Sequence, residues 1–406
     1  MFTEKWLQSF EHHKGSQLNP RQQPITYSTI MSSQKVLIAC DSAKSLIDFR
    51  GKLVELIRKE HTVYVFTPAI PPEQRAKLAF LNIVLFENDL NGSNVSVLSD
   101  LKYAYKLYRL IKQLKPDVFF PYTLKPVIYG TLAAKLGGVR KITPMLSGLG
   151  YTFVAGNTSV TSKITRILLR FSLRNRPGLS VIFQNNDDVK TLLDCKIISA
   201  KHQTAVVNGS GVDLSHYTPT QPDIDNISFI MVSRLINAKG IREYFEAAQI
   251  VFLKHPQVTF KLIGAYDDNV DAIHPDLFSE IKHRSVINYL GAVDDVRPYI
   301  SGSSVVVLPS YYREGIPRCL LEAMAMGRAI ITCDSVGCRE TVETSPNSNG
   351  FLIPVKNTAE LVHKMEYFIT NNQAISSFGL NGLALAQEKF DVHKVNARMM
   401  QIMGLN

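Results

Sequence analysis

Short apolar runs alternate with longer amphipathic stretches along most of this 406-residue chain. The runs are rich in Val, Ile and Phe, which is typical of strands buried on both faces of a parallel sheet. The stretches between them repeat apolar residues at three- and four-residue spacing, as amphipathic helices do. This alternation predicts βαβ units and an α/β fold. The expected strands are 35–40, 62–68, 82–87, 116–123, 141–147, 205–207, 227–232, 259–266, 286–293, 305–308 and 329–332.

A polar segment rich in Gly, Asn, Asp and Pro divides these strands into two groups, as an interdomain linker would. The chain is also long enough for two domains with separate cores. We therefore predict a first half at 35–207, a linker at 208–226 and a second half at 227–390, followed by a helix at 391–406. Residues 1–34 are predicted to be a disordered extension, and Met31 is a candidate translation start.

Composition narrows the class of protein. Apolar residues make up 45% and charged residues 20%, as in an ordinary globular protein. No apolar run approaches the roughly 20 residues that a membrane-spanning helix needs, and the first 30 residues have no signal-peptide core. The five cysteines show neither metal spacing nor an even disulfide framework, which favours a reducing cytoplasm.

The net charge of +10 is concentrated in two segments, 101–115 and 162–176, which each hold five cations and no acid. We interpret 101–115 as the solvated face of a helix. In 162–176 the cations recur at helical spacing beside apolar residues, which favours contact with an anionic membrane surface. A nucleic-acid partner is not expected, because no nucleic-acid-binding motif accompanies the charge. The cations at helical spacing are Lys163, Arg166, Arg170 and Arg174, and the apolar residues beside them are Ile164, Ile167, Leu168 and Phe171.

The most informative stretch runs from Val305 to Glu340. A buried strand ends at Pro309, a polar loop carries Glu314 and Gly315, and Pro317 suits the start of the helix that contains Glu322. Backbone N–H groups at the start of a helix suit a phosphate or a sugar, and a carboxylate can accept two hydrogen bonds from sugar hydroxyls.

Two cations, Arg234 and Lys239, follow the first strand of the second half and could neutralise a diphosphate. With the E-G-I-P and L-L-E-A-M-A-x-G motifs and the hinge-like N-G-S-G-V-D segment, this order of motifs resembles the retaining glycosyltransferases of family 4. That family has the GT-B fold, in which two Rossmann-like parallel-sheet domains face a central cleft and the last helix commonly crosses back to the first domain.

The resemblance implies roles for particular residues. Glu314 would lie against the donor sugar, Glu322 would hold the ribose, and Arg234 and Lys239 would stabilise the leaving diphosphate. The catalytic set is therefore Glu314, Arg234 and Lys239. The remaining donor-binding set is Glu322, Gly264, Tyr289, Gly291, Gly315, Ile316 and Pro317.

The segment 122–153 resembles family 4 enzymes that extend lipid-linked oligosaccharides for O-antigen, capsule or protein glycosylation. It implies a polyprenyl-diphosphate-linked acceptor, whose phosphate Lys125 or Arg50 would bind. The histidine that many members place in this loop is absent. The candidate acceptor-binding residues are Ser45, Arg50, Thr123, Lys125 and Gly148.

These features together predict a retaining glycosyltransferase that moves a hexose or N-acetylhexosamine from a UDP-sugar without cofactor or metal. The aspartate pairs 187–188, 267–268 and 294–295 lack the separation of a D-x-D metal site. The expected location is cytoplasmic, peripheral on the inner face of the plasma membrane. Two alternatives stay open: a nucleotide-sugar epimerase of the same fold, and a non-catalytic nucleotide-sugar-binding partner of a polysaccharide assembly complex.

Overall fold

The structure is a computed structural model that describes residues 33–79, 81–90, 97–153, 159–266, 271–283 and 286–405. The predicted N-terminal extension up to residue 32, with Met31, and the pair 267–268 lie outside the described residues. From Gln34 onward the chain forms one compact unit. It contains two large parallel sheets and one small one, which confirms the predicted α/β class.

The first half is built on a five-stranded parallel sheet with the order β3-β2-β1-β4-β5. A three-stranded parallel sheet, β6-β7-β8, continues from it through single bridges at Tyr122–Met145 and Ile142–Leu179. The strands are β1 Lys35–Ala39, β2 Thr62–Pro68, β3 Val84–Asn88, β4 Val118–Pro121, β5 Lys141–Ile142, β6 Met145–Leu146, β7 Ser180–Phe183 and β8 Gln203–Val206.

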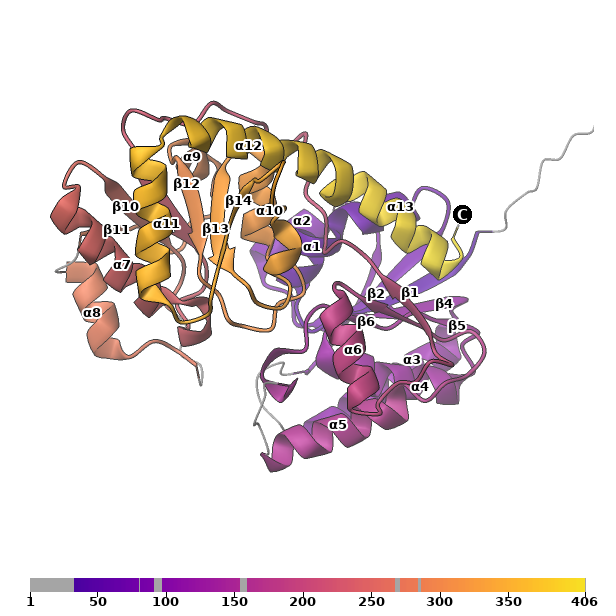
Figure 1. Ribbon diagram of the computed structural model, residues 1–406. Coiled ribbons are helices and arrows are strands. Elements are labelled where there is room, and N and C mark those ends of the chain that lie inside the picture. The colour runs from indigo at the N-terminus through magenta and orange to yellow at the C-terminus, as the bar shows by residue number, and fades with distance from the viewer. Residues whose placement is uncertain are drawn as a thin grey trace, which may run out of the picture. The chain divides into compact units, whose positions relative to one another are not determined.

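Alternate residues of β1 enter different core layers. Val36 and Ile38 pack in one cluster with residues of α1 and α13, while Leu37 and Ala39 pack in another with residues of α3 and α4. Helices thus cover both faces of this sheet (Figure 1). The helices of this half are α1 Ala43–Ile57, α2 Pro72–Ala79, η1 Pro126–Gly130, α3 Val97–Leu114, α4 Thr131–Gly137, η2 Gly150–Phe153, α5 Val160–Ser172 and α6 Asn186–Asp194.

The second half has a six-stranded parallel sheet with the order β11-β10-β9-β12-β13-β14. Every residue of β12 and β13 is buried, as expected for central strands covered on both faces. The strands are β9 Ser228–Val232, β10 Thr259–Ile263, β11 Ile287–Tyr289, β12 Val305–Leu308, β13 Ala329–Cys333 and β14 Gly350–Ile353. The helices are η3 Asn237–Lys239, α7 Ile241–Lys254, α8 Pro275–His283, α9 Arg297–Ser301, α10 Arg318–Ala325, η4 Arg339–Thr341, α11 Thr358–Thr370, α12 Gln373–Leu385 and η5 Ala386–Phe390.

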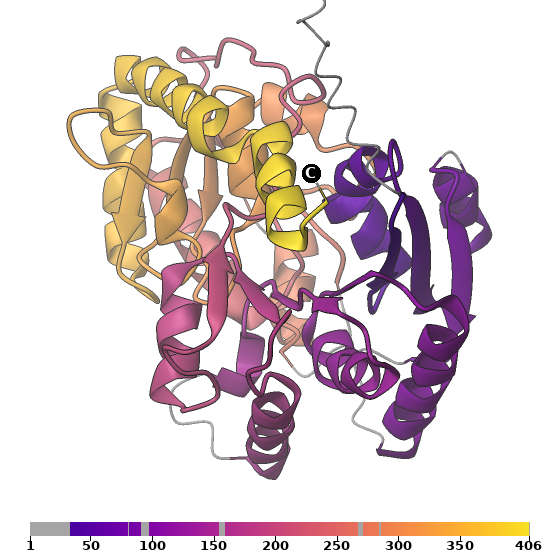
Figure 2. The same cartoon turned by 90° about the vertical axis from the view of Figure 1, so that its right-hand side faces the viewer.

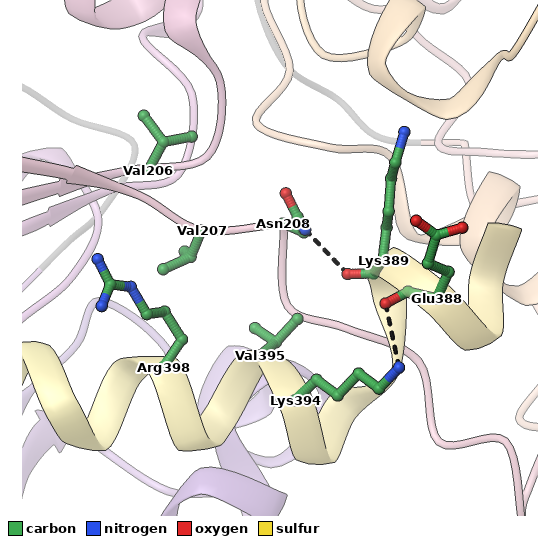
Figure 3. A pocket seen from close by; sticks show the side chains of 8 residues that line it. All are labelled: Val206, Val207, Asn208, Glu388, Lys389, Lys394, Val395 and Arg398. Atoms are coloured by element: carbon green, nitrogen blue, oxygen red, sulfur yellow. Dashed lines mark hydrogen bonds between the residues drawn. The ribbon is translucent and has the colours of Figure 1, made fainter.

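The chain passes between the two halves twice, and the two passages are bonded to each other. The Val212 amide donates to the Phe390 carbonyl at 2.7 Å, and the Val392 amide donates to the Val212 carbonyl at 3.0 Å. Beside them, Asn208 Nδ2 donates to the Lys389 carbonyl at 2.9 Å across a small pocket (Figure 3). The last helix, α13 Val392–Met403, then packs against α1, with Met399 and Met403 in the same buried cluster as Val36 (Figure 2).

Strands 62–68 and 305–308 have the predicted bounds, and most of the others are a few residues shorter. The predicted strand 141–147 is two short strands, because the Thr143 amide donates to Phe119 of the large sheet while the Pro144 carbonyl accepts from Ile182 of the small one. Pro317 is the N-cap of α10 rather than a residue of its first turn, and Gly327, at φ +73°, follows its C-cap. Within the described ranges, no helix is both long and apolar enough to cross a bilayer.

Candidate active site

Lys239 and Glu314 meet at the carboxyl ends of two neighbouring strands. Lys239 ends η3, which follows β9, and Glu314 lies in the loop after β12; β9 and β12 pair in parallel, so both loops emerge at one edge of the sheet. Lys239 Nζ forms an ion pair with Glu314 Oε1, which also accepts from Ser310 Oγ at 3.1 Å. The two charged side chains are only 12% and 13% exposed. Burial opposes the charge of Lys239, but Glu314 outweighs it and raises the pKa of Lys239, so the ammonium group stays charged.

Gly240 allows this approach of the two loops. It adopts φ +80°, and a Cβ there would lie 2.2 Å from the Pro309 carbonyl oxygen. A side chain at this position would push the turn that carries Lys239 away from the end of β12.

Arg234 is exposed at the end of β9, near Tyr312. Burial raises the pKa of Tyr312, Glu314 raises it further, and the charges of Arg234 and Lys239 lower it. Lys239 Nζ lies 5.8 Å from the centre of the Tyr312 ring. The fold therefore gathers the three predicted catalytic residues around one tyrosine.

Glu322 is buried on α10 and carries two hydrogen bonds on one oxygen. Its Oε1 accepts from the Tyr217 hydroxyl at 2.7 Å and from Arg318 Nε at 2.7 Å. Tyr217 comes from the linker, so the aromatic residue of the hinge-like motif positions the predicted ribose-binding carboxylate.

The glycine turns after β10 and β11 are bonded to each other. The Gly264 amide donates to the Gly291 carbonyl at 2.8 Å, and the Tyr289 hydroxyl donates to the Gly264 carbonyl at 2.9 Å. A Cβ at Gly264 would lie 1.7 Å from the Ser233 carbonyl oxygen, so the close approach at this glycine is to the neighbouring strand. Tyr289 is therefore engaged with Gly264 and also packs edge-on against Phe278.

Two amides of the first half hold the loop that carries Glu314. Asn185 Nδ2 donates to the carbonyl oxygens of Glu314 and Gly315, both at 3.2 Å, and the Ile316 amide donates to Gln184 Oε1 at 3.2 Å. The loop packs so closely that a Cβ on Gly315 would lie 1.8 Å from Gln184 Oε1, and one on Gly148 would lie 2.8 Å from the Gly315 amide nitrogen. Gly148, predicted to bind acceptor, thus packs against the loop that carries Glu314.

Ion pairs reinforce this contact. Arg313 Nη2 lies 3.2 Å from Asp188 Oδ1 and donates to Thr191 Oγ1 at 2.8 Å, and Arg339 forms an ion pair with Asp187. Burial raises the pKa of Asp188 to about 6, although Arg313 acts to lower it.

From the sequence alone we predict no role for Gln184 or Asn185, and we consider Asp187 and Asp188 only as candidate metal ligands. The available signal was a run of polar residues directly after a buried strand, at the edge where ligands of parallel sheets bind. In the part of the chain that is described, no three His, Cys, Asp or Glu side chains gather as metal ligands would.

Two protein-family models match the chain in tandem, "Glycosyl transferase 4-like" over residues 38–185 and "Glycosyl transferases group 1" over residues 226–371. The chain belongs to glycosyltransferase family 4. The two matches fall on the two halves described above, and the predicted glycosyltransferase activity is confirmed at this level.

This family 4 glycosyltransferase is similar to bacterial enzymes that act on lipid-linked sugars. It is 23% identical over 346 residues to the N,N'-diacetylbacillosaminyl-diphospho-undecaprenol alpha-1,3-N-acetylgalactosaminyltransferase of Campylobacter jejuni, covering 81% of this chain and 88% of that one. It is 24% identical over 285 residues to the UDP-Gal:alpha-D-GlcNAc-diphosphoundecaprenol alpha-1,3-galactosyltransferase of Escherichia coli, covering 67% and 71%.

Solved structures show the same fold. Anabaena HepE in complex with UDP and glucose superposes with a TM-score of 0.73 at 20% identity, covering 91% of this chain and 99% of HepE. Sucrose-phosphate synthase from Thermosynechococcus elongatus also gives a TM-score of 0.73, at 17% identity, covering 91% and 98%. These similarities confirm the GT-B architecture of the family 4 enzyme.

The acceptor candidates of the first half fall into two groups. Lys125 Nζ lies 3.0 Å from Asp100 Oδ1, and the Tyr129 hydroxyl donates to the other Asp100 oxygen at 3.0 Å. Ser45 Oγ lies 3.2 Å from the Tyr122 hydroxyl, and Arg50 is buried beside the Tyr122 ring. Between the groups, Thr123 adopts φ +69°, an unusual conformation for a β-branched residue that is often associated with functional sites.

Proposed function

We propose that this glycosyltransferase transfers a hexose or N-acetylhexosamine from a UDP-sugar to a polyprenyl-diphosphate-linked saccharide, with retention of the anomeric configuration. The observation that carries the proposal is the buried Lys239–Glu314 ion pair at the carboxyl edge of the second sheet. Two relatives support these substrates, since by name both act on diphospho-undecaprenol-linked sugars and one uses UDP-Gal.

The donor would bind along the carboxyl edge of the second sheet. Negative charge grows on the diphosphate as the bond to the sugar breaks, and Arg234 and Lys239 are placed to stabilise it together with the backbone N–H groups at the start of α10. These groups would act in place of a metal. Glu314 would then release Lys239 to the diphosphate and turn its carboxylate to the sugar hydroxyls.

The rest of the donor would be held by groups that are already ordered. Glu322, fixed by Tyr217 and Arg318, has its second oxygen for a ribose hydroxyl. The base would lie against the turns at Gly264 and Gly291, which their mutual hydrogen bond holds together.

The acceptor would reach the first half from a membrane. Helix α5 buries Leu169 but leaves Ile164, Ile167 and Phe171 51%, 55% and 63% exposed, among exposed cations of the same helix. Exposed apolar side chains flanked by Lys and Arg are typical of helices that lie in the interface of an anionic bilayer. We therefore place the enzyme peripherally on the cytoplasmic face of the plasma membrane.

A transfer assay tests the proposal. The purified enzyme would be incubated with a panel of radiolabelled nucleotide sugars and a membrane extract that contains polyprenyl-linked sugars, with and without a chelator. We expect label from one UDP-sugar to enter the lipid fraction at the same rate in both conditions. Conversion of the free nucleotide sugar without transfer would instead indicate an epimerase, and nucleotide binding with neither activity would indicate a non-catalytic binding partner.

A further inference from the structure

Arg50 is a buried arginine without an anionic partner. Arg50 is 2% exposed, and its Nε and Nη1 groups make no hydrogen bond within the described structure. Its Nη2 group donates to the thioether sulfur of Met145 at 3.1 Å, a weak acceptor. The guanidinium carbon lies 5.9 Å from the centre of the Tyr122 ring.

This arrangement is unfavourable for the folded protein on its own. Buried arginines are normally paired with carboxylates or carbonyl oxygens, because taking an ionised group out of water costs several kcal/mol. Burial lowers the pKa of Arg50 to about 10, and the nearby positive charge of Arg318 lowers it too. An uncompensated buried cation is typical of a site that is completed by an anionic ligand.

The second cation, Arg318, comes from the other half of the molecule. It is the first residue of α10, and its guanidinium carbon lies 5.5 Å from the centre of the Phe49 ring, next to Arg50 on α1. Glu322 is the carboxylate paired with Arg318. Arg318 is neutralised by Glu322, whereas within the described structure no carboxylate pairs with Arg50, so the positive charge of Arg50 is left uncompensated between α1 and α10.

We propose that Arg50 and Arg318 form an anion site, built from both halves, that receives the diphosphate of the prenyl-linked acceptor. The inference rests on the proposed function and deepens it, because it names the group that binds the acceptor's diphosphate. The hydroxyls of Ser45 and Tyr122, which lie 3.2 Å apart beside Arg50, supply neutral donors at the same place.

Lys125 is the competing candidate for this role, and its environment argues against it. Its ammonium group is paired with Asp100, whose side chain is 3% exposed and also accepts from Tyr129. A diphosphate at Lys125 would approach a buried carboxylate, whereas at Arg50 it would meet cations and hydroxyls.

The test is calorimetric titration of the enzyme, saturated with UDP so that the donor site is filled, with farnesyl diphosphate, farnesyl monophosphate and inorganic pyrophosphate. The variants are Arg50→Met, Arg50→Lys and, as a matched control, Arg58→Met, which changes an exposed arginine at the end of the same helix. We expect Arg50→Met to weaken farnesyl diphosphate about 10- to 100-fold, the loss of a charged hydrogen-bonding group, and Arg50→Lys to weaken it less. The Kd for UDP should change less than twofold.

Thermal unfolding separates the two roles, because a structural role for Arg50 and a ligand-binding role predict opposite changes in the Tm of Arg50→Met. Because Arg50→Met removes a buried charge without a partner and keeps a side chain of similar length, its Tm should equal or exceed that of the wild type in the absence of ligand. A large fall in the Tm of Arg50→Met, together with unchanged binding of farnesyl diphosphate by Arg50→Lys, would show that Arg50 is structural. That result would overturn the proposal.

The remaining outcomes are equally informative. Wild-type enzyme that does not bind farnesyl diphosphate in the presence of UDP, or an Arg50→Met variant that binds it normally, contradicts the site. If Arg50→Met loses affinity for UDP and for farnesyl diphosphate equally, Arg50 belongs to the donor site, which also contradicts the proposed acceptor site. Pyrophosphate that binds as tightly as farnesyl diphosphate would identify a free-diphosphate site instead. If farnesyl diphosphate binds through Arg50 but the transfer assay above shows no sugar transfer, the anion site stands and the proposed function is rejected. If Arg50→Met leaves transfer unaffected, the proposed function stands and the anion site is rejected.

Discussion

At the scale of single residues, the charges of Lys239 and Glu314 depend on each other. Both side chains are largely buried, and each neutralises the other. A sugar diphosphate would compete for Lys239 and leave the Glu314 carboxylate to the sugar. This exchange of partners explains why an acid and a base of opposite charge are placed together where an anionic donor is expected to bind.

We predict that Glu314→Ala abolishes transfer and that Glu314→Gln lowers kcat by roughly 10²- to 10³-fold, as loss of a preorganised charge does. The amide of glutamine can still accept from Ser310, but it leaves the buried Lys239 ammonium without its carboxylate, so the Tm of Glu314→Gln should fall below that of the wild type. Glu343→Gln, at an exposed glutamate of the same half, is the control. Steady-state transfer rates check this, and near-normal turnover by Glu314→Ala would reject the assigned site.

The raised pKa of Asp188 predicts that the free energy of unfolding depends on pH. Its pKa is about 6 in the folded protein against an ordinary value of 3.8, so the folded state binds more protons than the unfolded state between these values. The contribution of Asp188 to the free energy of unfolding therefore falls as the pH rises through this window.

Asp188→Asn should remove this dependence. We expect the free energy of unfolding of the wild type, relative to Asp188→Asn, to fall by roughly 1–3 kcal/mol between pH 4.5 and 7, as a shift of one to two pKa units implies. Urea unfolding at several pH values measures it. A difference that is constant with pH, or that grows as the pH rises, would contradict the raised pKa.

At the scale of elements, the junction of β7 and α6 holds the loop between β12 and α10. Gln184 and Asn185 follow the end of β7, and Asn185 is the N-cap of α6. Their side-chain amides bind backbone groups of residues 314–316. A single Asn185 side chain thus both caps a helix of the first half and bonds the Glu314 loop of the second.

We predict that Asn185→Ala lowers kcat about 10- to 100-fold, because a small displacement of reacting groups is costly, while the Kd for UDP changes little. Asn175→Ala is the matched control, since Asn175 is an exposed asparagine that bonds a backbone carbonyl within the first half. Transfer assays stopped at timed intervals measure kcat, and UDP titrations measure the Kd for UDP. An unchanged kcat would show that the loop keeps its position without this anchor.

At the scale of the whole molecule, α5 presents its exposed apolar and basic side chains away from the core that it covers with Leu169. Ile167, Arg170, Phe171 and Arg174 line one surface hollow, so cations and apolar groups face the same side. The proposed membrane contact lies in the first half, which also supplies Arg50 of the proposed acceptor site.

We predict that the double variant Ile167→Glu, Phe171→Glu binds vesicles with about one third anionic lipid at least about 10-fold more weakly than the wild type, since two buried apolar contacts are lost. Leu253→Glu, at an exposed leucine of α7 in the second half, should bind as the wild type does. Vesicle co-sedimentation at low and high salt measures both. Equal binding by the wild type and the double variant would reject α5 as the membrane-contacting element.

Much of the architecture could be predicted from local patterns, since apolar runs, amphipathic spacing and turn residues act over a few positions along the chain. Strands 62–68 and 305–308 and the end of α10 at Gly327 illustrate this. The split of 141–147 into two strands could not be predicted, because it depends on which neighbouring strand each amide finds.

The sequence by itself determined the α/β class, the family and the loop that carries Glu314, because these depend on residue order and short motifs. The tertiary structure decided which charges are neutralised. Lys125 and Arg50 were equal candidates in the sequence, yet packing gives Lys125 the carboxylate of Asp100 and gives Arg50 a thioether. Likewise, Asn185 and Glu314 are 129 residues apart, and only the packing of the two halves brings them together. Whether a buried charge is compensated depends on contacts between distant segments, and no local pattern records them.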